Sequence, residues 1–312
     1  MPLDPLAKRF LVMMAAATPG DRLRPTPNDR RQALTKLMQF ARADVTPATG
    51  TDGALPGPGG DIPYRLYDPA NDRSEYLPGF VFFHGGGMVA GSIDSHDRIC
   101  AALAHVTGCR LVSIGYRLAP EHKFPAAIED AIAATRWVSG HASSLGIDAT
   151  KLVVGGDSAG ATLAAVVCQD ALRNAGPAIS VQCLICPVLD FEDTSPSRQA
   201  FAENHLLDKA TLEADLADYL HEDADLADPR ISPLRATKFA GLPTAIIHTA
   251  EFDPMRDEGN AYAGKLVAAG VAVEHFCHDG MIHNFHAMGA VLPQARSVLH
   301  QIGEQVRRAL GN

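Results

Sequence analysis

The stretch that decides the fold is residues 151–160, Lys-Leu-Val-Val-Gly-Gly-Asp-Ser-Ala-Gly. Its apolar run Leu152–Val154 is typical of a short buried strand, and the residues after the serine have the apolar spacing of a helix. The chain is therefore predicted to turn sharply from strand to helix at Ser158. Gly156 and Gly160 flank this serine, because a strained turn needs neighbours without a Cβ where strand and helix approach each other. The serine hydroxyl would then lie at a helix N-terminus, which favours negative charge.

The composition is that of a soluble globular protein. The chain has 312 residues, of which 46% are hydrophobic and 20% charged, and a formal net charge of -9. This acidic balance, without a run of lysine or arginine, argues against nucleic acid and against an anionic membrane surface as partners. No apolar stretch reaches the roughly 18 residues of a membrane span. The length fits one large α/β domain or two smaller ones.

The first residues loosely resemble a secretory signal peptide. Lys8 and Arg9 precede an apolar run at residues 10–17, whereas Asp4 lies where a signal peptide carries positive charge. We interpret this segment as an amphipathic helix.

The cysteines are spread over predicted strands and helices, which is typical of reduced core thiols in a cytosolic protein. Cys183 and Cys186 form a Cys-x-x-Cys pattern, but in a strand residues three apart point to opposite faces, which disfavours a redox or zinc role. We expect a cytoplasmic location, and the oligomeric state stays open, with a homodimer as one option. The six cysteines are Cys100, Cys109, Cys168, Cys183, Cys186 and Cys277.

Buried strands alternate with helices along most of the chain. This alternation predicts an α/β fold with a mainly parallel sheet that is covered by helices on both faces. Residues 46–60, rich in proline, glycine and threonine, are predicted to be a linker or exposed turns. The predicted strands are residues 62–67, 80–83, 111–116, 152–154, 181–189, 244–250 and 271–277, and the predicted helices include residues 95–107 and 126–140.

Two segments outside this alternation are predicted to cover the active-site end of the sheet. Residues 1–45 contain two helical patterns separated by prolines. The interval 190–242 is too long for a plain loop between neighbouring strands. The predicted organisation is therefore 1–45 N-terminal cap helices, 46–190 first part of the catalytic core, 191–240 cap excursion and 241–312 second part of the core.

Partners for the serine follow two later strands. A serine hydroxyl needs a base to take its proton, and a carboxylate to hold that base in the right tautomer. Asp253 follows predicted strand 244–250, and His283 follows predicted strand 271–277. The carboxyl ends of parallel strands meet at one edge of the sheet, where Ser158 also lies. Ser, Asp, His is the chain order expected of an α/β-hydrolase.

Other acidic residues have plainer interpretations. Glu251 is the main alternative to Asp253 as the triad acid. Asp157 is adjacent to the serine and is interpreted as fixing the turn. Asp257 and Glu258 are expected to begin a helix, where carboxylates favour the N-terminal dipole.

The clustered histidines also allow a zinc interpretation. It is disfavoured because one of them lies within a predicted strand and no cysteine or carboxylate completes a ligand set, so no metal site is predicted. These histidines are His275, His278, His283 and His286.

Donors for the oxyanion are expected from two places. The backbone N–H of Ala159 follows the nucleophile directly, and the sequence His-Gly-Gly-Gly at 84–87 lets backbone amides point into the site. Gly86 is the first choice, with Gly85 or Gly87 beside it. His84 is interpreted as a support for this loop.

Four motifs in this order resemble the hormone-sensitive-lipase-like, or bacterial family IV, esterases. They are His-Gly-Gly-Gly at 84–87, Tyr-Arg-Leu-Ala-Pro-Glu-His-Lys-Phe-Pro-Ala at 116–126, Gly-Asp-Ser-Ala-Gly at 156–160 and Asp-Pro-Met-Arg-Asp-Glu at 253–258. The resemblance covers nearly the whole chain. It implies an α/β-hydrolase core with a helical cap and no cofactor. It also implies hydrolysis of small carboxylic esters with short to medium acyl chains by a triad of Ser158, Asp253 and His283.

Two positions depart from the family pattern. Met88 stands after the three glycines where the family often has a large aromatic residue, and Asn284 follows the histidine where the family often has glycine. We expect both side chains to line or border the substrate pocket and to affect substrate preference more than mechanism.

The sequence therefore predicts a serine carboxylesterase that works through an acyl-enzyme. The same motifs leave open a related hydrolase of amides, lactones or carbamates, an acyltransferase, or a non-catalytic ligand-binding protein on the same fold.

Overall fold

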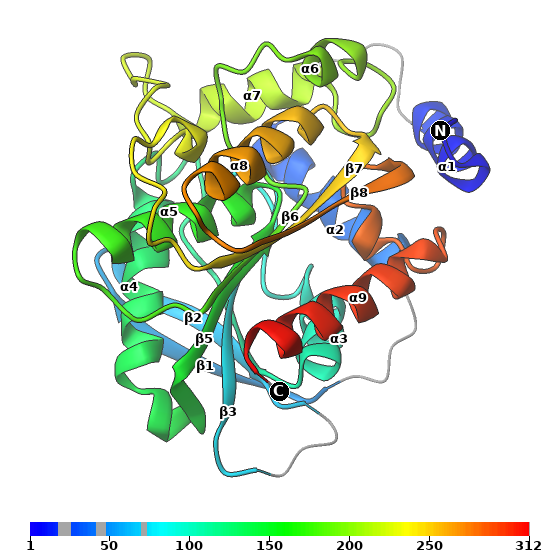
Figure 1. Cartoon of the computed structure of the whole chain (residues 1–312). Helices are drawn as coiled ribbons and strands as arrows, with labels where there is room; N and C mark the ends of the chain where they lie inside the picture. The colour runs from blue at the N-terminus through cyan, green and yellow to red at the C-terminus, as the bar shows by residue number, and fades with distance from the viewer. Residues whose placement is uncertain (18–25, 42–47, 70–73, 312) are drawn as a thin grey trace.

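The computed structural model describes residues 1–17, 26–41, 48–69 and 74–311, and its centre is one eight-stranded sheet (Figure 1). The strand order is β1-β2-β4-β3-β5-β6-β7-β8. β2 pairs antiparallel with β1 and β4, and all other pairs are parallel. The strands are β1 Gly50–Gly57, β2 Gly60–Tyr67, β3 Leu77–Phe83, β4 Arg110–Ile114, β5 Ile147–Asp157, β6 Val181–Ile185, β7 Thr244–Phe252 and β8 Val273–Ile282.

Alternating side chains divide the core into two layers, one on each face of the sheet. Val81 and Phe83 of β3 pack with α4, α5 and α8, whereas Phe80 and Phe82 pack with α3 and α9. The period of two along a strand sends neighbours to opposite faces, which explains why the strands read as continuous apolar runs. These helices are α3 Asp97–Thr107, α4 Ala126–Gly140, α5 Ala159–Arg173, α8 Arg256–Ala268 and α9 Gln294–Ala309.

The remaining helices come from the two segments outside the alternating pattern. They are α1 Pro5–Ala17, α2 Pro27–Ala41, α6 Pro196–Ala200 and α7 Lys209–Tyr219. In Figure 1, α6 and α7 lie above α8, on the side of the molecule toward which the arrows of β7 and β8 point. Residues 18–25 and 42–45 of the predicted N-terminal cap lie outside the described residues.

The predicted linker at residues 46–60 is wrong for most of its length, because Gly50–Gly57 forms β1 and pairs with β2. β1 is an edge strand in which Leu55 alone is buried, so it lacks the apolar pattern that identifies central strands. Residues 46 and 47 of that prediction lie outside the described residues. β8 also ends later than predicted, at Ile282, directly before His283.

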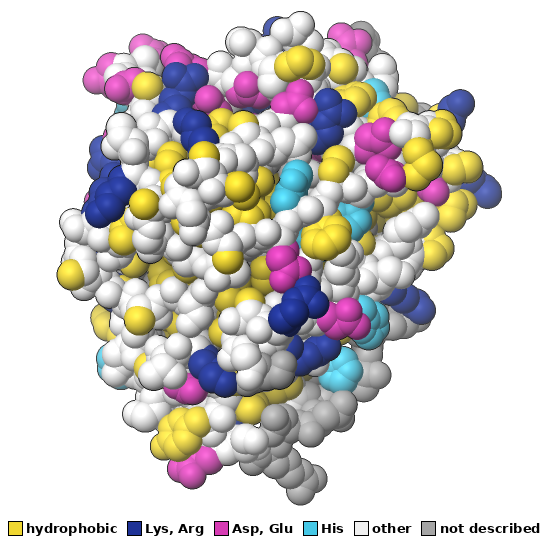
Figure 2. Space-filling model, viewed as in Figure 1, with side chains coloured by type: hydrophobic (Ala, Val, Ile, Leu, Met, Phe, Trp, Pro, Cys, Tyr) yellow, Lys and Arg dark blue, Asp and Glu magenta, His cyan; other side chains and the backbone are white. Residues whose placement is uncertain are grey.

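The surface carries dispersed charge. On the face shown in Figure 2, basic side chains lie scattered among acidic ones, and acidic side chains gather at the upper left corner. Among the described residues, no helix is both long and apolar enough to cross a membrane.

Candidate active site

Ser158 occupies the turn between β5 and α5 in a conformation that few residues adopt. Its φ is 51° and its ψ is −120°, and such strained geometry costs about 1–3 kcal/mol. The flanking glycines permit it, since a Cβ on Gly160 would lie 2.0 Å from Phe83 O and one on Gly156 would lie 2.4 Å from the same oxygen. The backbone of β3 therefore leaves no space for a side chain beside the serine.

The structure brings together the three residues predicted as a triad. His283 Nε2 lies 3.0 Å from Ser158 Oγ, and His283 Nδ1 lies 2.7 Å from Asp253 Oδ2. The other oxygen of Asp253 accepts the backbone N–H of Met255 (2.9 Å), which fixes the carboxylate. All three side chains are buried, with Asp253 fully so. Buried hydrogen-bonded groups of this kind keep their geometry, so the imidazole is aligned between acid and hydroxyl.

The glycine loop offers fewer oxyanion donors than the sequence predicts. Gly85 donates its N–H to Asp157 Oδ1 (3.0 Å), so it is not available to an oxyanion, and the prediction of Gly85 as an oxyanion donor is wrong. The amides of Gly86, Gly87 and Ala159 donate to no acceptor among the described residues. The direction of an amide depends on local φ and ψ, which the motif alone does not specify.

Asp157 and His84 support this loop from behind. Burial acts to raise the pKa of the Asp157 carboxyl, but the nearby His96, whose Nε2 lies 3.4 Å from Oδ2, lowers it to about 2. His84 stacks on Tyr116 with ring centroids 4.3 Å apart, and its Nδ1 lies 2.9 Å from Gly85 O. Burial lowers the pKa of His84 to about 3, so the ring is neutral near pH 7.

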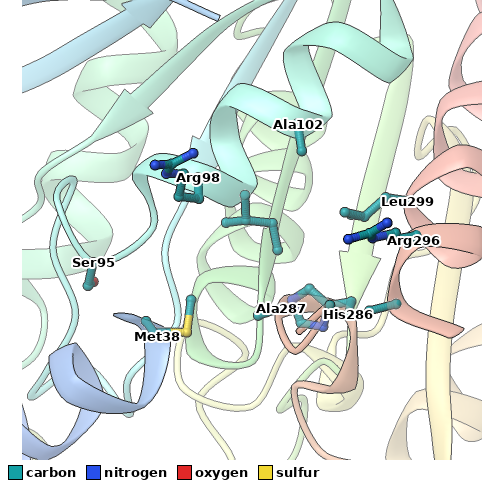
Figure 3. Close-up of a pocket in the computed structure, with 11 residues that line it drawn as sticks. Met38, Ser95, Arg98, Ala102, His286, Ala287, Arg296 and Leu299 are labelled. Carbon is teal, nitrogen blue, oxygen red and sulfur yellow. The ribbon is translucent and has the colours of Figure 1, made fainter. Parts of the chain in front are cut away.

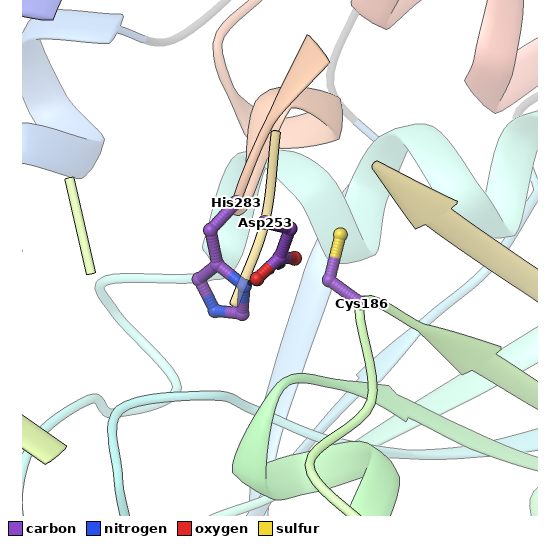
Figure 4. A group of neighbouring side chains, drawn as sticks. All are labelled: Cys186, Asp253 and His283. Atoms are coloured by element: carbon purple, nitrogen blue, oxygen red, sulfur yellow. Dashed lines mark hydrogen bonds and ion pairs between the residues drawn. The ribbon is translucent and has the colours of Figure 1, made fainter. Parts of the chain in front are cut away.

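Cys186 is a neighbour of the triad that the sequence analysis missed. Its Sγ, a carboxylate oxygen of Asp253 and a ring nitrogen of His283 all lie within 4.8 Å of one another. Figure 4 shows the three side chains. Cys186 follows β6 directly and β6 pairs with β7, so the sheet order brings it to the strand that Asp253 follows. Asp253 and His283 are hydrogen-bonded within the triad, which favours a structural interpretation of this cluster over a metal site.

The rivals to the triad residues lie elsewhere. Glu251, the alternative acid, accepts the N–H of Gly280 (2.7 Å) and pairs with the N-terminal amine. The histidines considered for zinc are dispersed, since His275 contacts Thr249 and His278 contacts His248. Asp257 and Glu258 lie in the first turn of α8, as predicted. Glu258 also accepts the amides of residues 189 and 190, a buried role that the sequence analysis missed.

The two departures from the family pattern both have left-handed backbones. Met88 has a φ of 63° and is 1% exposed, and its carbonyl accepts the N–H of Ala119 (2.9 Å). Asn284 has a φ of 58°, and its buried Oδ1 has no hydrogen-bond partner among the described residues.

Two cavities lie near the site without containing the triad. One of about 30 Å³, lined by Met38, Arg98 and His286 among others (Figure 3), has room for about one water molecule and not for an ester. The other, of about 460 Å³, is lined in part by His84 and Tyr116, behind the glycine loop.

Comparison with known proteins gives consistent results. A family described as having the alpha/beta hydrolase fold matches residues 80–287. Carboxylic ester hydrolase LipN of Mycobacterium tuberculosis is 44% identical over 75% of this chain and 64% of that protein. Ethyl acetate hydrolase of Pseudomonas putida is 40% identical over 81% of this chain and 80% of that protein.

Solved structures of ester hydrolases superpose on this chain over nearly its full length. An ester hydrolase from the metagenome of Lake Arreo, in complex with a derivative of bipyridine phosphonate, superposes with a TM-score of 0.96 at 40% identity, covering 99% of this chain and 100% of that chain. The esterase of Pyrobaculum calidifontis gives a TM-score of 0.90 at 34% identity, covering 98% and 99% of the two chains. The chain belongs to the family with the alpha/beta hydrolase fold and, within it, to the hormone-sensitive-lipase-like carboxylic ester hydrolases.

Proposed function

We propose that Ser158 is the nucleophile of this ester hydrolase, with His283 as its base and Asp253 as the acid that orients the base. The hydrogen-bonded chain from Ser158 Oγ through His283 to Asp253 Oδ2, at 3.0 and 2.7 Å, carries this proposal. A neutral imidazole that receives a hydroxyl proton on Nε2 and keeps a carboxylate at Nδ1 is the arrangement that serine hydrolysis requires.

Acylation begins when Ser158 Oγ attacks the ester carbonyl carbon and His283 Nε2 takes the hydroxyl proton. The resulting oxyanion accepts hydrogen bonds from the amides of Gly86, Gly87 and Ala159. His283 then gives its proton to the oxygen of the leaving alcohol, and the acyl group stays on the serine. Water attacks the acyl carbon of this intermediate while His283 takes a proton from the water. The bond from Ser158 Oγ to the acyl carbon then breaks, His283 returns the proton to Oγ, and the carboxylic acid leaves.

The substrates proposed are carboxylic esters with short to medium acyl chains. Ethyl acetate, named for the relative from Pseudomonas putida, is an ester of this size. We also propose that residues 1–45 and 191–240 form a cap over the site, because α7 lies against Gly87 of the glycine loop and α2 contacts Val89 just after it. Met88 and Asn284 are proposed to border the pocket.

A chain-length series tests this function. Hydrolysis of p-nitrophenyl esters from acetyl to palmitoyl is measured for the wild type, for Ser158→Ala and for Ser113→Ala, a change at a second buried serine on β4. We expect short esters to be cleaved, Ser158→Ala to lose at least about 10⁴-fold in kcat, and Ser113→Ala to keep the wild-type rate. Cleavage that survives Ser158→Ala would contradict the assignment.

A phosphonate ester gives a second, independent readout. Phosphonylation should place one added group on the peptide that contains Ser158 and on no other, as mass spectrometry would detect. Labelling of a different residue would require another nucleophile.

The compartment proposed is the cytoplasm, since all six cysteines are free and five are buried, as suits a reducing environment. The homodimer stays a prediction, which light scattering of the purified protein would check.

A further inference from the structure

An ion pair joins the two segments of the proposed cap. Arg30 of α2 donates from Nε to Asp215 Oδ1 (3.0 Å) and from Nη2 to Asp215 Oδ2 (2.6 Å), although 185 positions separate the two residues in the chain. The Asp215 side chain, on α7, is 8% exposed and that of Arg30 is 20% exposed. A two-pronged arginine–carboxylate contact of this kind is among the strongest that side chains form.

The carboxylate in this pair lies against the glycine loop. A Cβ built on Gly87 would lie 2.0 Å from Asp215 Oδ2 and 2.6 Å from its Cγ. Since a carbon–carbon bond is about 1.5 Å long, the Gly87 Cα itself is within about 3.5 Å of that oxygen. The amide nitrogen of Gly87, one bond further, is then within about 5 Å of a carboxylate.

A negative charge at this position opposes the reaction proposed above. The oxyanion forms about 3 Å from the amides of Gly86 and Gly87, which places it within about 8 Å of the carboxylate, and like charges at such a distance repel each other in a partly buried site. Asp215 would therefore raise the energy of the tetrahedral intermediate unless a cation compensated it. Arg30 supplies that cation on the far side of the carboxylate.

We propose that Arg30 is a positioning residue that compensates the charge of Asp215 and so keeps the oxyanion hole favourable for negative charge; this inference rests on the proposed function. The pair fixes α7 over Gly87 and places a positive charge beside the carboxylate at the same time. The neighbouring Arg31 has a different role, because it donates to the carbonyls of Val89 (2.9 Å) and Ala119 (3.0 Å) and so joins α2 to the segment after the glycine loop.

A double-mutant cycle separates charge compensation from simple attachment of the cap. The variants are Arg30→Met, Asp215→Asn, the double variant and Arg30→Lys, with Arg136→Met as a control that removes an ion pair on α4 far from the loop. Each is assayed with p-nitrophenyl butyrate at a temperature where circular dichroism shows it folded.

Charge compensation predicts an unusual order of rates. Arg30→Met should lower kcat by about 10- to 100-fold, because the carboxylate loses the positive charge that Arg30 supplies. The double variant should recover at least tenfold relative to Arg30→Met, although it lacks both members of the pair. Asp215→Asn should raise kcat by a few-fold, and Arg30→Lys should keep most of the rate. Arg136→Met should behave as wild type.

The division of the effect between kcat and KM provides a readout that attachment alone would not move. Charge compensation acts on the oxyanion of the tetrahedral intermediate, so Arg30→Met should lower kcat and leave KM nearly unchanged. A loss confined to KM would contradict charge compensation.

Attachment alone predicts equal losses in Arg30→Met, Asp215→Asn and the double variant, and that outcome would overturn the inference. If Arg30→Met does not fold, Asp215→Asn still decides, since attachment predicts a loss and compensation a gain. The wild type separates failure of the proposed function from failure of the charge role of Arg30. If the wild type forms no acyl-enzyme at Ser158, the proposed function fails. If the wild type is active and the three variants lose equal activity, only the charge role is refuted.

Discussion

Asp157, the residue before the nucleophile, accepts a hydrogen bond at Oδ1 from the backbone N–H of Gly85, 72 positions earlier in the chain (3.0 Å). The contact is closed to a side chain, because a Cβ on Gly85 would lie 2.6 Å from Asp157 Oδ2. One carboxylate therefore sets the distance between the turn that carries Ser158 and the loop that binds the oxyanion.

Replacing this carboxylate should reduce catalysis more than it reduces binding. Asp157→Ala leaves the Gly85 N–H unsatisfied in the interior, at a cost of about 1–3 kcal/mol, and frees the loop. We expect kcat to fall about 10- to 100-fold with a smaller change in KM, measured by steady-state kinetics. Asp157→Asn keeps an acceptor oxygen and should lose less; equal losses in the two variants would contradict this role of the hydrogen bond.

The glycines beside the serine should be intolerant of even one methyl group. The new Cβ would lie 2.0 Å from Phe83 O in Gly160→Ala and 2.4 Å from the same oxygen in Gly156→Ala. We therefore expect each variant to lose more than about 2 kcal/mol in the free energy of unfolding. Gly264→Ala in α8 is the matched control, since no atom lies within 4 Å of its Cβ. It should stabilise the protein by about 0.5–1 kcal/mol. Urea unfolding measures all three, and similar effects in all of them would contradict the steric account.

Thiol reagents should distinguish one cysteine from the rest. Cys277 is exposed and the other five are buried. Burial raises the pKa of both the Cys277 and the Cys186 thiols, and that of Cys186 well above its usual value. Only thiolates react, so we expect native protein at pH 8 to release one equivalent of thionitrobenzoate rapidly and to keep its esterase activity. Cys277→Ala should release none. Rapid inactivation by the reagent would show that Cys186, beside Asp253 in Figure 4, is accessible after all.

Acid should unfold the protein steeply. Burial lowers the pKa of His84 and His248 to about 3 and that of His286 to about 4. The unfolded chain binds protons at these histidines from about pH 6.5 downward whereas the folded chain does not, so stability is present above that pH and is lost as the pH falls. The three groups together should lower the free energy of unfolding by about 4 kcal/mol per pH unit.

Unfolding by urea between pH 7 and 4.5 checks this prediction. His286→Gln should reduce the slope by about 1.4 kcal/mol per pH unit, because it removes one titrating group. Neither ring nitrogen of His286 has a hydrogen-bond partner among the described residues, although Nε2 lies 4.0 Å from Asp157 Oδ2. An unchanged slope would mean that His286 is protonated in the folded state.

The parts of the site that the sequence predicts are those with a local pattern. Ser158, Asp253 and His283 each follow directly on a strand, and parallel strands bring their carboxyl ends together whatever the intervening loops do. The prediction of the hormone-sensitive-lipase-like family is confirmed by the matched family and by the relatives.

The features of the site and fold that the sequence does not predict depend on contacts between distant segments of the chain. No pattern around Arg30 or Asp215 indicates that α2 and α7 meet over Gly87. The amide of Gly85 looks like its neighbours in sequence, and only the position of Asp157 directs it away from the oxyanion. The sequence of β1 predicts a linker, because an edge strand in which only Leu55 is buried has the composition of a loop.

Because of the strand order, the distance from Ser158 to His283 and the pairing of His283 with Asp253 can be changed independently. Asp253 and His283 follow the adjacent strands β7 and β8, whereas Ser158 follows β5, with β6 between them. A substitution that alters the twist between β6 and β7 would therefore move acid and base together, as one unit, relative to the hydroxyl. Libraries directed at β6 can vary the attack distance while the pairing that keeps the imidazole in its working tautomer is left intact.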